Sequence, residues 1–195
     1  FTAQEQTSLY ISDVTLLGAQ YSALIAEGRS KIALTDSHVT NCSASAGGAV
    51  YLSGNSTLML TDCDLSDNAA LAGDGGAIYL TGSHVIAMRT RVARNKATQS
   101  ALGNGGGIFA DKSSTVSVKG GAFDANTAAK AGGAIFAASG SSVALMNATR
   151  LTMNTAELGA WVSSCSASLR SCFSMLWHAA PTHSSSLSLS LSLSL

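Results

Sequence analysis

Apolar and polar positions along this chain repeat at intervals of about 27 residues. The clearest copy is Gly75-Gly76-Ala77-Ile78-Tyr79-Leu80, in which two glycines precede alternating apolar residues. Copies of it begin at Gly47, Gly105 and Gly132, and a weaker copy begins at Leu158. A helical hairpin can have a similar length, but paired glycines and strict alternation favour strands.

Each repeat predicts three short strands. Leu58 and Leu60 alternate with polar residues on a first strand, Leu65 lies on a second, and the Gly-Gly-Ala-Ile stretch supplies a third. One such coil cannot bury its apolar side chains alone, whereas coils stacked about 4.8 Å apart pair every strand in parallel. The sequence therefore predicts an all-β fold, a right-handed parallel β-helix of about five coils. An inner aliphatic column is expected from Val50, Ile78, Ile108 and Ile135.

Two residue types recur at fixed places in the repeat. An asparagine precedes each glycine pair, and stacked amides can bond the coils above and below as a ladder. The predicted ladder is Asn41, Asn68, Asn95, Asn126 and Asn154. The glycine pairs are expected at turns that need a positive φ or a close backbone approach. They are Gly47, Gly48, Gly75, Gly76, Gly105, Gly106, Gly132 and Gly133.

The repeat pattern divides the chain into four parts. Residues 1–21 are expected to form a partial first coil and residues 22–160 the β-helix repeats. Residues 161–183 keep no repeat register and are interpreted as an irregular or helical cap. Residues 184–195 consist of Ser and Leu, which alternate strictly from Ser186, and we interpret this tail as low-complexity sequence without a function.

Charged residues make up only 11% of the chain and balance to zero. This composition argues against nucleic-acid binding, which needs a basic stripe, and no apolar run of about 18 residues predicts a transmembrane segment. Moving 27 residues along the chain matches each of three acids with an arginine. The predicted inter-coil ion pairs are Asp62 with Arg89, Asp64 with Arg91, and Asp67 with Arg94. We favour this interpretation over a calcium or catalytic carboxylate site, so no catalytic residue, metal site or cofactor is expected.

A second candidate site is the aromatic column Tyr51, Tyr79, Phe109 and Phe136, one residue after the aliphatic column. If the aliphatic residues point inward, the rings point outward and form a candidate binding face for sugars or a protein. The alternatives are rings that merely stack on one another and shield the sheet, or rings that face the core.

Three further residue types were weighed for chemistry. The four histidines have no metal-ligand spacing and are interpreted as solvated side chains, and cysteine pairing stays open. Asn55, in Asn55-Ser56-Thr57, is the candidate glycosylation site, whereas Asn41 is expected to point inward and to be a poor acceptor.

The repeat resembles that of the polymorphic outer-membrane protein family (Pmp-like repeats). Asn68-Ala69-Ala70, Asn126-Thr127-Ala128 and the Gly-Gly-Ala-Ile stretches carry the resemblance, over about residues 22–160. It implies a right-handed parallel β-helix that acts in surface display and adhesion.

The expected function is a non-enzymatic surface or secreted scaffold for adhesion or display, with a glycan or a host or cell-surface protein as partner. The expected location is extracellular or at the cell surface, at the outer membrane if the source is bacterial. Two alternatives are a β-helix polysaccharide lyase or hydrolase, and a fragment of a repeat array with no independent function.

Overall fold

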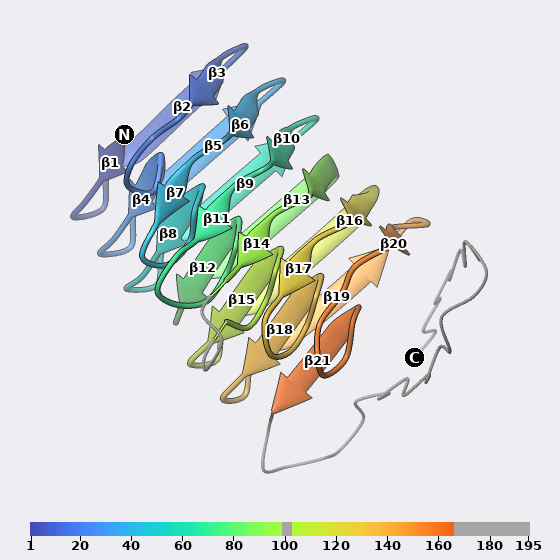
Figure 1. Cartoon of the computed structure of the whole chain (residues 1–195). Helices are drawn as coiled ribbons and strands as arrows, with labels where there is room; N and C mark the ends of the chain where they lie inside the picture. Colours follow the sequence, from blue (N-terminus) through green and yellow to red (C-terminus); the bar gives the residue numbers. More distant parts are fainter. Residues whose placement is uncertain (99–102, 166–195) are drawn as a thin grey trace.

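The computed structural model describes residues 1–98 and 103–165, and in these residues the chain winds into a parallel β-helix of about six coils (Figure 1). Every strand pairs in parallel with strands one coil away, and the described residues contain no helix. The prediction of an all-β parallel β-helix is thus confirmed. Residues 1–21, predicted as a partial first coil, supply strands to two of the three sheets.

Sheet A contains the strands that follow the glycine pairs. Its order along the axis is β1 (Thr2–Ala3), β4 (Leu24–Ala26), β8 (Val50–Leu52), β12 (Ile78–Thr81), β15 (Ile108–Asp111), β18 (Ile135–Ala138) and β21 (Val162–Cys165). β21 pairs with β18. The interpretation of residues 161–183 as an irregular or helical cap is therefore wrong for Val162–Cys165, which continue the solenoid. The rest of that segment and the tail 184–195 lie outside the described residues.

Sheet B is the widest sheet and has two arms on either side of a bend. Its long arm contains β2 (Ser8–Ser12), β5 (Lys31–Thr35), β9 (Thr57–Thr61) and β19 (Ser142–Met146). Its short arm contains β3 (Thr15–Leu17), β6 (His38–Thr40), β10 (Asp64–Ser66) and β20 (Arg150–Thr152). In two coils a single strand spans both arms: β13 (His84–Ala93) and β16 (Thr115–Asp124).

Sheet C is narrow, with two residues from each of four coils. It consists of β7 (Ser43–Ala44), β11 (Ala69–Ala70), β14 (Lys96–Ala97) and β17 (Thr127–Ala128). The chain then crosses the paired glycines and returns to sheet A, which closes each coil.

The core is a set of like-on-like apolar columns between the sheets. Val50, Ile78, Ile108 and Ile135 pair in register and are almost completely buried, as the sequence predicts. Leu58 on the long arm faces the same interior and is also fully buried. Burial of each such side chain contributes about 1.5–3 kcal/mol to the free energy of unfolding. A single coil could not bury these side chains, so the stacking of coils provides this stabilisation.

Candidate functional site

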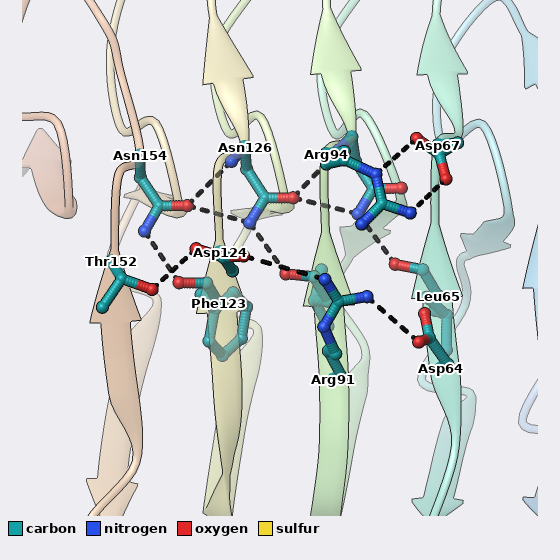
Figure 2. A network of polar contacts seen from close by, with 12 residues as sticks. Asp64, Leu65, Asp67, Arg91, Arg94, Phe123, Asp124, Asn126, Thr152 and Asn154 are labelled. Carbon is teal, nitrogen blue, oxygen red and sulfur yellow. Dashed lines mark hydrogen bonds and ion pairs between the residues drawn. The ribbon is translucent and has the colours of Figure 1, made fainter.

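Four asparagines form a continuous ladder at the corner between sheets B and C, and Figure 2 labels two of them, Asn126 and Asn154. Asn95 Nδ2 donates to Asn126 Oδ1 at 2.9 Å and to the backbone oxygen of Leu65 at 2.9 Å. The amide oxygen of Asn95 accepts from both nitrogens of Asn68. Asn126 and Asn154 repeat this arrangement. All four are buried, so the ladder satisfies backbone groups that no strand partner reaches.

The prediction that Asn41 belongs to this ladder is wrong. Strand β6 pairs with β10 as Thr40 with Ser66, so the coil between them has 26 residues and Cys42 takes the ladder position. The backbone nitrogen of Cys42 donates to Asn68 Oδ1 at 3.0 Å. Asn41 is exposed and has a φ of 53°, in the turn position just before the ladder. Because it points outward, the reason given for treating Asn41 as a poor glycosylation acceptor also fails.

A second ladder, of serines, lies at the corner between sheets A and B. The backbone nitrogen of each member except the last donates to the hydroxyl of the serine in the next coil, at 3.1 or 3.2 Å. Its members are Ser30, Ser56, Ser83, Ser114 and Ser141. Sequence reasoning missed this ladder. Its signal is a serine two residues before the first inward residue of each long-arm strand, as in Ser56-Thr57-Leu58.

The paired glycines have two separate roles. The first glycine of each pair has a positive φ, for example 70° at Gly75. The second has no room for a side chain: a Cβ atom on Gly76 would lie 2.1 Å from the oxygen of Gly106 and 2.6 Å from the nitrogen of Lys96. The same pattern holds for the other predicted turn pairs: Gly47 and Gly48, Gly105 and Gly106, and Gly132 and Gly133. Each pair therefore lets the turn press directly against a strand of sheet C.

The structure places each of the three predicted acid–arginine pairs in contact across adjacent coils. Arg89 Nε donates to Asp62 Oδ1 at 2.7 Å, and Arg94 Nε donates to Asp67 Oδ1 at 2.8 Å. Both contacts are bidentate, since the Nη2 of each arginine bonds the second carboxylate oxygen.

The third pair is part of a larger network. Arg91 Nη1 donates to Asp64 Oδ2 at 3.1 Å, and Arg91 Nη2 also lies 3.7 Å from Asp124 (Figure 2). Asp124, which the sequence analysis did not single out, accepts a hydrogen bond from the Thr152 hydroxyl at 2.7 Å.

The arginine contacts affect the protonation of Asp62 and Asp67. The hydrogen bond from Arg89 lowers the pKa of Asp62, and the hydrogen bond from Arg94 lowers the pKa of Asp67. A general acid in a glycosidase needs the opposite, a carboxyl group with a raised pKa. Asp62 and Asp67 are therefore held more firmly as anions, which suits inter-coil pairing better than proton transfer.

A shallow pocket of about 270 Å³ lies next to this network on the short arm of sheet B. It is lined by Arg91, Ala122, Asp124, Arg150 and Thr152. Arg150 is exposed. Among residues 1–98 and 103–165, no acid pairs with it, so the pocket contains a guanidinium group that is available to a ligand.

The aromatic column is a tight stack on the outer side of sheet A. Ring centroids of Tyr51, Tyr79, Phe109 and Phe136 are 5.3, 5.2 and 5.6 Å apart, with nearly parallel planes. Phe109 is only 7% exposed, and burial raises the pKa of Tyr79. Because the faces of Tyr79 and Phe109 are covered by neighbouring rings on both sides, the edges of these rings rather than their faces meet solvent. Sugars stack on ring faces, so this arrangement favours mutual shielding over a sugar platform.

Asn55 lies in the turn between β8 and β9, exposed and with a φ of 62°. Its side-chain oxygen lies 3.0 Å from Nε2 of His84, whose Nδ1 is 2.7 Å from the Thr115 hydroxyl. His84 therefore bridges two neighbours on the surface and is not simply solvated. Asn55 stays an accessible candidate for glycosylation.

The remaining candidates for chemistry are few. Cys42 and Cys63 are free and buried, and burial raises the pKa of the Cys63 thiol. Within the described ranges, no group of histidine, cysteine or acidic residues is placed to hold a metal ion. The same residues include no helix long and apolar enough to cross a membrane.

A comparison with models of known protein families agrees with this fold. A family model described as the right-handed beta helix region matches residues 2–168. The chain therefore belongs to the right-handed β-helix family. Comparisons with curated proteins and with solved structures found no significant match.

Proposed function

We propose that this chain is a non-enzymatic scaffold of the cell surface or of a secreted protein, which serves adhesion or display. Its binding wall is the outer face of sheet B. One observation carries this proposal: Tyr10, Met59 and Ile86 lie in one column on that face, 78%, 42% and 39% exposed. The core does not use these side chains, and exposed apolar groups gathered on a flat sheet are typical of interaction sites.

The state of the carboxylates supports a scaffold over a polysaccharide lyase or hydrolase. Asp62, Asp64 and Asp67 each contact an arginine of the next coil. Such an enzyme needs carboxylates that are free to move protons or to bind calcium. These three acids are instead paired across coils, which suits a wall that contacts a partner over several coils.

The resemblance of the repeat to the polymorphic outer-membrane protein family supports the same function and an extracellular or cell-surface location. The partner is a glycan or a protein of a cell surface. No nucleic-acid role is proposed, since the chain has zero net charge.

A binding screen tests this proposal. The intact chain is applied to a glycan array and to a panel of cell-surface proteins, beside a Met59→Ser/Ile86→Ser variant that alters only exposed side chains. A Tyr51→Ala/Tyr79→Ala variant tests the aromatic column in parallel. We expect wild-type binding that the Met59/Ile86 variant loses. Equal binding by wild type and that variant, or release of sugar products from a polysaccharide, would contradict the proposal.

A further inference from the structure

In one column of outward residues on the short arm of sheet B, an alanine interrupts an alternation of acidic and basic side chains. The strand register places Asp64 beside Arg91, Arg91 beside Ala122, and Ala122 beside Arg150. The order along the axis is therefore acid, base, alanine, base. Opposite charges directly across adjacent strands stabilise a sheet, so an acid is the residue that would best fit between the two arginines.

The small side chain of Ala122 leaves room at that position. Phe123 is buried in the core, so its neighbour Ala122 faces outward, and the pocket of about 270 Å³ lies over it. Coils are about 4.8 Å apart, which puts Arg91 and Arg150 about 10 Å from each other along the axis. A carboxylate placed over Ala122 would thus lie one coil from each guanidinium group.

The polar groups around the pocket differ in whether they already have an ion-pair or hydrogen-bond partner. Arg91 is already paired with Asp64 and lies 3.7 Å from Asp124, while Arg150 has no acidic partner among the described residues. On the side of the pocket, Asp124 accepts a bond from Thr152 and keeps further acceptor capacity. The site therefore offers positive charge at its centre and a hydrogen-bond acceptor at its edge.

We propose that this pocket binds a carboxylate with a neighbouring hydroxyl group. The carboxylate takes the place of the missing acidic side chain and pairs with Arg150 and Arg91, and the hydroxyl donates to Asp124. A simple anion without a hydroxyl fits less well, because Asp124 repels it and receives no hydrogen bond. This site extends the proposed binding wall, on whose function it rests, and its ligand is either a small hydroxy acid or an acidic sugar residue.

A titration of the full chain followed by NMR tests the ligand chemistry. The probes are glucuronate, glycerate, acetate, sulfate and glucose. We expect dissociation constants of about 1 mM for glucuronate or glycerate, weakened by added salt, and several-fold weaker binding of acetate and sulfate. Binding of glycerate shows that a small acid suffices, and binding of glucuronate alone identifies an acidic sugar. No binding of either acid, or equal binding of acetate, would overturn the proposal.

Two substitutions locate the site. Arg150→Gln removes the unpaired guanidinium and should weaken binding at least tenfold. Ala122→Asp supplies the missing carboxylate within the chain, so it should abolish binding and raise Tm by a few degrees, whereas the matched control Ala122→Asn should not raise Tm. Unchanged binding in Arg150→Gln, or equal Tm values for the two Ala122 variants, would refute the site. Both readouts are independent of the Met59/Ile86 screen, so the site and the wider function can fail separately.

Discussion

At the scale of single residues, the buried asparagine amide is what joins one coil to the next. Asn95 donates to Asn126 and to Leu65, and accepts from Asn68. An apolar residue at this place would leave a buried carbonyl and a buried amide without partners. Each such orphan group costs about 1–3 kcal/mol.

Replacement of Asn95 by Ala should therefore lower the free energy of unfolding by about 3 kcal/mol. Asn41→Ala is the matched control, because Asn41 is exposed and outside the ladder, and it should cost only about 1 kcal/mol of backbone strain at its φ of 53°. Chemical denaturation of both variants measures the difference. Equal losses of stability in the two variants would show that the asparagine ladder does not stabilise the fold.

The arginine pairs make stability depend on pH. The hydrogen bond from Arg94 lowers the pKa of Asp67 in the folded state, while the unfolded value is about 3.9. The stabilisation from this pair is present above the unfolded pKa and is lost as the pH falls through the folded pKa.

Thermal melts of wild type should therefore lose more Tm between about pH 5 and pH 2 than melts of Asp67→Asn. Asp13→Asn is the control, since Asp13 has no ion pair within the described residues. Because the pair is partly exposed, added salt should reduce the difference. Parallel Tm curves for wild type and Asp67→Asn would show that the pair contributes nothing.

The sequence predicts some of these single-residue contacts and not others. The asparagine ladder could be predicted from Asn68 onward because each of these asparagines follows an inward apolar residue by three positions, as Asn68 follows Leu65. Asn41 follows Val39 by only two, and the 26-residue coil moves Cys42 into register instead. The acid–arginine pairs could be predicted because charge is rare in this chain. The serine ladder could not, since serine is too common to stand out. The pocket over Ala122 depends on a missing side chain, which no motif records.

At the scale of elements, the glycine pair fixes how each coil closes. Gly76 lies against the oxygen of Gly106 and strand β14, where a Cβ atom would collide with backbone that cannot move away alone. The position therefore specifies the distance between the turn and sheet C. This explains why the pair precedes each of the strands β8, β12, β15 and β18.

The substitution Gly76→Ala should destabilise the fold by several kcal/mol, because it forces the turn and β14 apart. Gly82→Ala is the control: Gly82 has a positive φ, which Gly76 lacks, but the nearest atom to its Cβ would be 3.7 Å away. It should cost only about 1 kcal/mol of backbone strain. Denaturant midpoints compare the two, and similar losses would argue against the close approach.

At the scale of the whole molecule, the repeat determined almost all of what could be predicted about the fold. Its period gave the parallel coils and the inner aliphatic column, because each coil is stable only on top of another. Residues 1–21 were predicted as a partial first coil, whereas strand β21 was placed in a cap, since its turn keeps only Gly159 of the glycine pair. Outer residues do not serve the core, so the pattern said little about which face binds a partner.

The central claim is that equivalent residues of successive coils lie directly above one another. Spin labels on outward long-arm positions test it, with one label at Ser8 and the other at Thr115 or Ser142, four or five coils away. The labels go into a variant whose native cysteines are replaced by serine, and pulsed EPR measures their separation. Before the length of the labels is added, the stack predicts about 19 Å between Ser8 and Thr115 and about 24 Å between Ser8 and Ser142. The second distance is longer by one coil spacing. Distances that do not increase from Thr115 to Ser142, or that exceed these values several-fold, would contradict it.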